Sequence, residues 1–146
     1  MSTVYLIRGL PGTGKTTLAE RLKVDGVMVA ADDYFYCEDG VYRFDPKLLG
    51  LAHADCQLKA SVVLCDGRDV VVHNTFSQRW EMQPYIDMAI LHGARLVVLD
   101  LFDGGCTDEQ LVERNSHGVP LHAIARMRER WEHDWKIAST PLDQPQ

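Results

Sequence analysis

Residues 9–16 read Gly9-Leu10-Pro11-Gly12-Thr13-Gly14-Lys15-Thr16, and this stretch decides the fold. It fits G-x-x-x-x-G-K-[ST], the pattern of a phosphate-binding P-loop. The residues before it, 4–7, are a short apolar run typical of a buried parallel strand. The residues after it place Leu18, Ala19 and Leu22 on one face of a helix. A strand, a glycine-rich loop and a helix in this order are the setting that the motif requires.

The chemistry of the loop follows from its residue types. Glycines let successive backbone N–H groups turn inward around a phosphate, and the start of the helix adds partial positive charge. Lys15 is predicted to reach the β- and γ-phosphates, and the Thr16 hydroxyl is the predicted Mg²⁺ ligand. The cofactors we expect are therefore ATP and Mg²⁺, although the sequence does not decide between ATP and GTP. The predicted phosphate-binding residues are Gly12, Thr13, Gly14, Lys15, Thr16 and Thr17.

The length and net charge of the chain limit the classes of protein to which it can belong. A chain of 146 residues predicts a single domain, which we place at residues 1–136, with residues 137–146 as a loose polar tail. That length leaves no room for the second, helical domain of a hexameric motor ATPase. The net charge of −6 gives no support to nonspecific coating of DNA, yet it still allows nucleic acid to bind in a local basic cleft.

Cysteine usage and hydropathy indicate the compartment. The four cysteines include no C-x-x-C pair and follow no secretory signal, which predicts reduced thiols in the cytoplasm, or in the host cytoplasm if a phage encodes the chain. His53 and Cys56 have half of a metal-ligand spacing, but no second pair follows, so we expect no such site. No apolar run approaches the length needed to cross a membrane, so no membrane partner is expected. The oligomeric state is not indicated.

Alternating strand and helix patterns predict the architecture. Further apolar, strand-like runs occupy residues 27–30, 70–73 and 96–101, with helical patterns between them. Asp45 and Pro46 are predicted to open one helix, a second runs from about Ser77 with a break at Pro84, and Thr107 and Gln110 form a capping box. Pro120 is predicted to open the last helix. We therefore expect an α/β P-loop sandwich of three layers, with a parallel sheet of about four to five strands and a C-terminal helical lid.

Polar residues follow three of the predicted strands. They are the P-loop itself, the pair Asp32-Asp33 and the triplet His73-Asn74-Thr75. Ligands of parallel α/β sheets bind at the carboxyl ends of the strands, so these residues are expected to meet in one site. Asp32 is placed to accept or orient the proton of an attacking hydroxyl. Asp33 either supports the Mg²⁺ site from outside the directly bound ligands or caps the helix that follows it.

Three classes of P-loop protein compete. A switch GTPase would carry D-x-x-G and N-K-x-D, and neither occurs. A mechanical or regulatory ATPase fits the small size less well than a phosphoryl-transfer enzyme does. A kinase also needs positive charge next to the phosphoryl group that it transfers. Arg114 can supply this charge, because it lies in a short segment that joins two predicted helices and can close over the phosphates. Arg114 is the predicted catalytic arginine, and Arg126 is a candidate for substrate binding. We expect Arg128 and Arg130 to lie on a solvated helix face, although the periodicity points Arg128 partly inward.

Taken together, these motifs resemble those of the polynucleotide kinase group of P-loop kinases. The P-loop with its Pro11, the segment Ala31-Asp32-Asp33-Tyr34, the pair Asn74-Thr75 and the lid Arg114-Asn115 with Val119-Pro120 occur in that group's order and spacing. The resemblance spans nearly the whole chain. It implies a kinase whose catalytic residues are Lys15, Asp32 and Arg114, with Asp32 as the general base, and a nucleic acid as acceptor.

The acceptor half departs from the phage 5′-hydroxyl kinases of this group. Those proteins carry an arginine after the D-D-Y segment and a basic residue late in the lid, where this chain has Phe35-Tyr36 and His117-Gly118. Some relatives in the wider group phosphorylate hydroxymethyl groups of modified pyrimidines in DNA, so a 5′-hydroxyl end and such a base are both expected acceptors. A small metabolite or nucleoside remains an alternative, as does a nucleotide-gated module without enzymatic activity. The predicted acceptor-binding residues are Asp32, Asp33, Phe35, His73, Asn74, Thr75 and Arg126.

Overall fold

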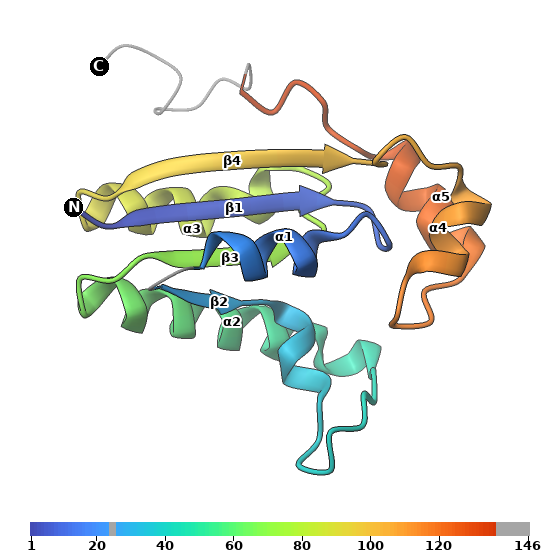
Figure 1. Ribbon diagram of the computed structural model, residues 1–146, viewed down its shortest axis with the longest axis horizontal. Coiled ribbons are helices and arrows are strands. Elements are labelled where there is room, and N and C mark those ends of the chain that lie inside the picture. The colour runs from blue at the N-terminus through green and yellow to red at the C-terminus, as the bar shows by residue number, and fades with distance from the viewer. Residues whose placement is uncertain (24–25, 137–146) are drawn as a thin grey trace.

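Four parallel strands form the central sheet of the computed structural model, which describes residues 1–23 and 26–136. They are β1 (Thr3–Gly9), β2 (Val27–Val29), β3 (Val70–Asn74) and β4 (Arg95–Phe102), in the order β2-β3-β1-β4. The strand that leads into the P-loop therefore lies inside the sheet, between β3 and β4. All four strands end on the same side of the sheet (Figure 1), so the polar residues that follow them gather there.

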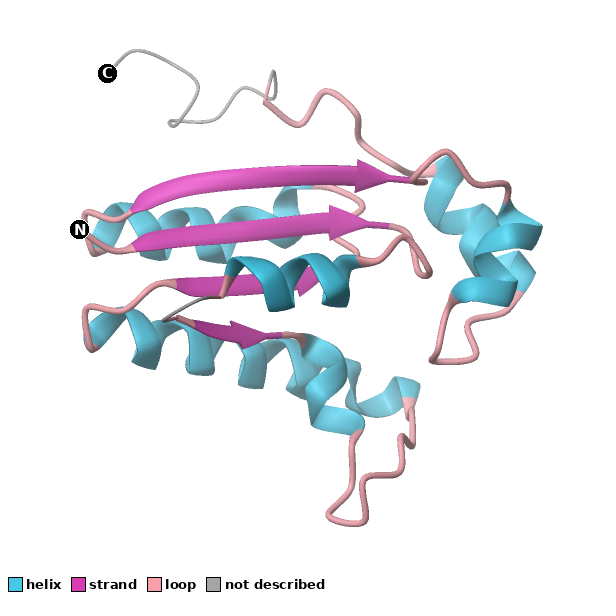
Figure 2. Ribbon diagram, viewed as in Figure 1, coloured by secondary structure: helices cyan, strands magenta, loops and turns pink. Residues whose placement is uncertain are grey.

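Helices cover both faces of this sheet (Figure 2). Helix α1 (Lys15–Leu22) packs on one face, where Ala19 contacts the buried side chains of Ile7 and Val71. Helices α2 (Leu49–Cys65) and α3 (Arg79–Leu91) pack on the other face, over the main core. The alternation of residues along β1 explains this division, because Leu6 points to the main core and Ile7 points to α1. The predicted three-layer α/β fold is confirmed.

Helix α2 is more apolar than the sequence analysis allowed. Within the described residues, Pro46–Cys65 is long and apolar enough to cross a membrane, with a mean hydropathy of 1.2, so the expectation of no such run is wrong. Its inner residues Ala52, Cys56 and Ala60 are fully buried in the main core, as in a core helix of a folded domain. Its outer residues Leu58 and Val62 are 65% and 54% exposed.

Local sequence signals set most helix boundaries. Asp45 caps the 3-10 turn η2 (Pro46–Leu48) by accepting a hydrogen bond from the Lys47 N–H at 3.0 Å. The break predicted at Pro84 is wrong, because α3 continues through this residue. Proline removes one N–H, which leaves the carbonyl of Trp80 without its helical donor, and that residue is 70% exposed, so water can bind there.

The last two helices form a separate unit beyond the ends of β1 and β4 (Figure 1). They are α4 (Asp108–Arg114) and α5 (Leu121–Glu129), and the capping box predicted at Thr107 and Gln110 is present at the start of α4. Their small core contains Leu10, so a P-loop residue is buried among lid residues. The other buried members are Cys106, Leu111, Ile124 and Trp131. The tail predicted at residues 137–146 lies outside the described residues.

Candidate active site

The P-loop is fixed by the two strands that flank β1. The N–H of Gly9 donates to the carbonyl of Thr75 at 3.2 Å, and the N–H of Leu10 donates to the carbonyl of Phe102 at 2.8 Å. Gly14 begins α1 with a φ of 93°, a left-handed conformation that favours glycine. The loop thus connects the ends of three strands before the helix starts, and the backbone amides that would bind phosphate are held in place.

Lys15 points back into the P-loop. Its Nζ donates to the carbonyl oxygens of Gly9 at 2.8 Å and Leu10 at 3.1 Å. Burial lowers the pKa of Lys15 to about 8, although the nearby charge of Asp32 acts in the opposite direction. A triphosphate entering the loop would compete for this ammonium group with two neutral carbonyls, and its greater negative charge would favour the charged form of the lysine.

The start of α1 has donors suited to magnesium. Thr16 and Thr17 are exposed, so the Thr16 hydroxyl is accessible where the P-loop pattern requires a Mg²⁺ ligand. Among the described residues, no three His, Cys, Asp or Glu side chains form a group able to hold a metal ion. Mg²⁺ is usually bound by one or two protein oxygens together with substrate phosphates and water. Thr16 would supply that oxygen, and the ion would neutralise charge on the phosphates.

Asp32 lies in the 3-10 helix η1 (Ala31–Phe35), directly after β2. Its Oδ1 accepts a hydrogen bond from the Tyr42 hydroxyl at 2.9 Å, and its Oδ2 lies 3.2 Å from Nδ1 of His117 in the lid. Burial opposes ionisation of Asp32, but the bonds from His117 and Tyr42 and the charge of Lys15 outweigh it and lower the pKa of this carboxyl. The side chain is still 47% exposed. An ionised, oriented and accessible carboxylate thus lies within the electrostatic reach of Lys15.

The residues next to Asp32 have structural roles. The Asp33 carboxylate accepts a hydrogen bond from the N–H of Ala30 at 3.1 Å, so it caps η1, which is one of its two predicted roles. The Asn74 side chain accepts from the N–H of Ala31 at 2.9 Å and therefore fixes η1 to the end of β3. Thr75 contributes its carbonyl to the P-loop bond with Gly9. These residues position the site.

Two other predicted acceptor residues are buried. Phe35 is 3% exposed and packs against Tyr42 and Phe44, so the expectation that its ring faces an acceptor is wrong; the apolar ring lies in the main core. His73 is 8% exposed at the end of β3, and burial lowers its pKa, which keeps the imidazole neutral. Its Nε2 has no hydrogen-bond partner among the described residues. His73 is therefore a buried polar group close to the charges of Lys15 and Asp32.

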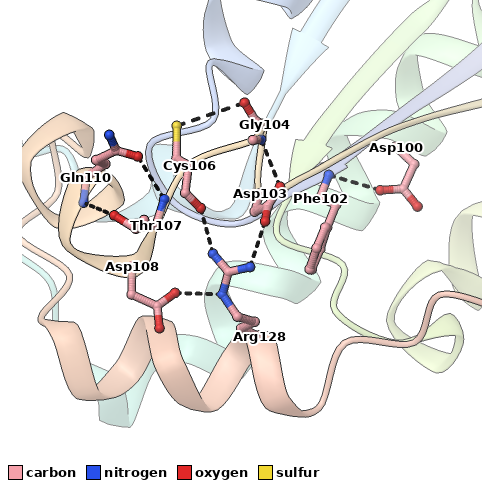
Figure 3. Close-up of polar contacts among 10 residues, drawn as sticks. Asp100, Phe102, Asp103, Gly104, Cys106, Thr107, Asp108, Gln110 and Arg128 are labelled. Atoms are coloured by element: carbon pink, nitrogen blue, oxygen red, sulfur yellow. Dashed lines mark hydrogen bonds and ion pairs between the residues drawn. The ribbon is translucent and has the colours of Figure 1, made fainter.

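The lid arginines have three different environments. The Cβ of Arg114 lies beside Gly12 of the P-loop. Its guanidinium lies 2.9 Å from the Cys106 sulfur, so the side chain would have to turn to reach a phosphate in the loop. Arg126 is exposed on α5. Arg128 instead holds the lid together, because its guanidinium contacts Asp103 at 2.6 Å and Asp108 at 2.7 Å (Figure 3). Arg128 therefore has a structural role in the lid, whereas the sequence predicted a solvated position for it.

Sequence reasoning missed the residues that hold Asp32. Tyr42 lies on the irregular segment between η1 and η2, and His117 lies on the loop between α4 and α5. Their rings stack with centroids 4.3 Å apart, and the His117 Nε2 lies 3.1 Å from the Tyr36 hydroxyl. Residues on irregular loops, separated by more than seventy positions, have no periodicity that would link them. The signal available in the sequence was their chemical type, because tyrosine and histidine can both donate a hydrogen bond to a carboxylate.

Comparison with known proteins identifies the family of the chain. The family model described as "AAA domain" matches residues 4–133, which is most of the chain. The chain belongs to this family. Among curated proteins, human NEDD4-binding protein 2 is 37% identical over 148 residues, a match that covers 95% of this chain. The chain spans only 8% of that relative's length, so the match concerns one segment of a much longer protein.

Solved structures show the P-loop kinase fold. A chain of the Pnkp1/Rnl/Hen1 RNA repair complex matches with a TM-score of 0.70 at 18% identity, over 89% of this chain and 44% of that one. Chaetomium thermophilum Kti12 in complex with ADP-AlF3 matches with a TM-score of 0.67 at 17% identity, over 97% and 86%. A gluconokinase from Sinorhizobium meliloti 1021 matches with a TM-score of 0.62 at 14% identity, over 96% and 85%. The TM-scores establish a shared fold, and at these low identities the acceptor must be argued from this chain's own residues.

Proposed function

We propose that this chain is an ATP- and Mg²⁺-dependent kinase that transfers the γ-phosphate to a hydroxyl group of a nucleic acid. The observation that carries the proposal is the Asp32 carboxylate, held by Tyr42 and His117 and coupled electrostatically to Lys15 in the P-loop. A P-loop alone supports many functions. A fixed carboxylate across from it supplies what phosphoryl transfer to an alcohol needs, which is a group that orients the attacking hydroxyl.

The charges of the residues in this site suggest a role for each of them. Lys15, the P-loop amides and Mg²⁺ on Thr16 would hold the triphosphate and neutralise its charge, and Arg114 would approach from the lid. Asp32 would accept a hydrogen bond from the acceptor hydroxyl and receive its proton as the new P–O bond forms. The transition state of phosphoryl transfer is loose, so orientation by an ionised carboxylate is sufficient and a strong base is not required.

Exposed aromatic rings on the segment that carries Asp32 and follows β2 support a nucleic acid acceptor. Tyr34, Tyr36 and Phe44 are 38%, 46% and 52% exposed on the segment that follows β2. Protein recognition of unstacked bases relies on such rings, because every base has a face that can stack on them. Both acceptors suggested by the family resemblance, a 5′-hydroxyl end and a hydroxymethyl pyrimidine in DNA, present bases next to the reacting hydroxyl.

The deciding experiment incubates the chain with γ-labelled ATP and a panel of acceptors. The panel contains 5′-hydroxyl DNA, 5′-hydroxyl RNA, hydroxymethyl-pyrimidine DNA, nucleosides and gluconate. Label on a nucleic acid, with an affinity that falls as salt rises, supports the proposal. Label only on a nucleoside or on gluconate would identify a metabolite kinase. ATP turnover that requires a protein partner and labels none of the acceptors would identify a regulatory module.

The matched variant for this assay is Asp32→Asn. We expect ATP affinity close to that of the wild type, because the amide lies outside the P-loop. Phosphoryl transfer should fall by about 10²-fold or more, because the amide cannot receive the proton of the hydroxyl. Titration with a fluorescent ATP analogue and the labelled-acceptor assay measure the two quantities separately. Transfer at the wild-type rate in Asp32→Asn would contradict the role assigned to this carboxylate.

A further inference from the structure

His117 is the residue through which the lid reaches the acceptor side of the site. It lies on the loop that joins α4 to α5, whereas Asp32, Tyr36 and Tyr42 lie in and after η1, far away in the sequence. All three of these residues contact the imidazole. The ring is only partly exposed, with 23% of its side chain accessible, so it is embedded between the two segments.

The hydrogen-bond pattern fixes how the imidazole is used. Nδ1 faces a carboxylate oxygen at 3.2 Å, so Nδ1 carries the hydrogen. In the neutral ring Nε2 is then an acceptor, and the Tyr36 hydroxyl at 3.1 Å can donate to it. Stacking on Tyr42, with an interplanar angle of 24°, holds the plane of the ring. Both ring nitrogens of His117 therefore have a partner, and the orientation of the ring is determined.

The same contacts fix the plane of the carboxylate. Tyr42 binds Oδ1 and His117 binds Oδ2, so the two oxygens of Asp32 are held by separate segments of the chain. A carboxylate has about four lone-pair positions, and these bonds use two of them. The others stay available to an acceptor hydroxyl, which agrees with the 47% exposure of this side chain.

The loop that presents His117 is itself braced. The Asn115 side-chain amide donates to the carbonyls of Leu111 and Val119, and its oxygen accepts from the N–H of Val119 at 2.9 Å. This one side chain thus connects the end of α4 to the segment before α5, and it holds together the two ends of the loop that carries His117. At the other side of the lid, the carbonyl of Leu111 lies so close to Gly12 that an added Cβ there would be 2.8 Å from it. The lid therefore contacts the phosphate loop and the acceptor carboxylate at once.

We propose that His117 is a positioning residue of phosphoryl transfer, which orients Asp32 from the lid and makes the acceptor side of the site depend on where the lid lies. This inference rests on the proposed kinase function. It adds that the lid acts on both substrates: through the P-loop on ATP, and through His117 on the acceptor.

The test compares His117→Ala with two matched variants in the full chain. His122→Ala removes an exposed histidine from the first turn of α5 and is the control for loss of a lid imidazole. His117→Asn keeps an N–H close to the position of Nδ1 and is the conservative variant. Thermal unfolding first establishes that each variant folds.

We expect His117→Ala to lower kcat/KM for the acceptor by roughly 10- to 100-fold, the loss typical of one hydrogen bond to a charged group. The Kd for ATP should stay unchanged, because the contact between Gly12 and Leu111 is intact. His117→Asn should recover most of the loss, and His122→Ala should match the wild type. A role in folding of the lid alone would instead weaken ATP and acceptor equally.

Hydrogen exchange separates failure of this inference from failure of the proposed function. In His117→Ala, amides of residues 115–119 should exchange faster than in the wild type and in His122→Ala. If the wild type labels no acceptor, the kinase proposal fails, and the exchange result alone decides whether His117 holds the lid. If the wild type is active, equal kcat/KM for acceptor in His117→Ala overturns the positioning role, whatever the exchange shows. An equal loss for ATP and acceptor overturns it too.

Discussion

At the scale of single residues, the site is built around two opposite charges, the ammonium of Lys15 and the carboxylate of Asp32. Lys15 is held by neutral carbonyls and has a lowered pKa, whereas Asp32 is held by two donors and also has a lowered pKa. The first shift makes the lysine easier to deprotonate, and the second keeps the carboxylate ionised at neutral pH. A carboxylate of this kind orients a hydroxyl better than it removes a proton, which suits a reaction with a loose transition state.

The pKa of Lys15 predicts opposite pH trends for binding and stability. Its value of about 8 in the folded protein lies below the usual lysine pKa of 10.5, so the folded state releases this proton at lower pH than the unfolded chain does. The free energy of unfolding should therefore rise with pH between about pH 8 and 10.5, because the unfolded chain binds more protons than the folded protein in that range. Affinity for ATP should fall over the same range, because the phosphates need the charged ammonium.

The variant Lys15→Met isolates both trends, since methionine is of similar length and does not titrate. ATP affinity at pH 7 should fall by roughly 10- to 100-fold, the loss of a charged hydrogen-bond partner. The difference from the wild type in ATP affinity and in unfolding free energy should change with pH only above about pH 8. Isothermal titration and urea unfolding at pH 7, 8 and 9 measure the two differences. Differences that are constant across this range would contradict the lowered pKa.

Much of the site was predictable at this scale, and the limit has a physical reason. The P-loop carries its own pattern, because glycine, lysine and threonine must occupy fixed positions to surround a phosphate. Asp32 was predictable because it follows a strand. Tyr42 and His117 were not, because their contact with Asp32 depends on how two loops fold back on the site. Phe35 shows the opposite error: an aromatic residue beside a site was assigned to substrate, and it lies in the core.

At the scale of elements, the P-loop and α4 depend on each other through Gly12. This residue has a φ of 90°, and a Cβ added to it would lie 2.8 Å from the carbonyl of Leu111 and 3.2 Å from the N–H of Asn115. Leu10, two positions earlier, is buried in the core of the lid. The sequence predicted a lid from its helices and arginines, but not that its base is packed against the phosphate loop.

Gly12→Ala is predicted to disturb both elements. The positive φ costs an alanine about 1–2 kcal/mol, and the contact with Leu111 adds to this by displacing α4. We expect a fall of about 2–3 kcal/mol in the free energy of unfolding, together with weaker ATP binding. Gly50→Ala is the control, because nothing lies within 4 Å of its added Cβ. That variant lies within α2 and should be neutral or more stable by up to ~1 kcal/mol. Urea unfolding of the two variants tests this, and equal stabilities would contradict the close packing.

At the scale of the whole molecule, Arg8 connects segments from three parts of the chain. It lies on β1 and is fully buried. Its guanidinium donates to the carbonyls of Phe76 at 3.0 Å, Ser77 at 3.1 Å and Glu132 at 3.0 Å. It also pairs with Asp100 at 3.1 Å. Phe76 has a φ of 48°, unusual for a bulky residue, so these bonds hold a strained peptide at the end of the site.

We predict that Arg8→Met lowers the free energy of unfolding by ~3 kcal/mol, because the buried bonds to Phe76 and Ser77 and the part-buried bond to Glu132 are lost while the size of the side chain is nearly kept. Arg43→Ala is the control: its pair with Asp39 is exposed, and its loss should leave the urea midpoint unchanged. A midpoint for Arg8→Met equal to that of the wild type would show that water replaces the guanidinium at no cost. This role of Arg8 could not be predicted from the sequence, since a charged residue inside an apolar strand only interrupts the pattern that identifies the strand.

The position of β1 in the sheet has a consequence for synthesis of the chain. The strand is made first, yet its partners are β3 and β4, which begin at Val70 and Arg95. At ~5–20 residues per second, Val4 to Ile7 would wait for several seconds with both edges unpaired while the ribosome completes these partners. The emerging segment is apolar and rich in strand formers, so we expect chaperones that protect nascent chains to bind it. The phosphate loop is therefore translated before the strands that hold it, and it can take its final form only after they are made.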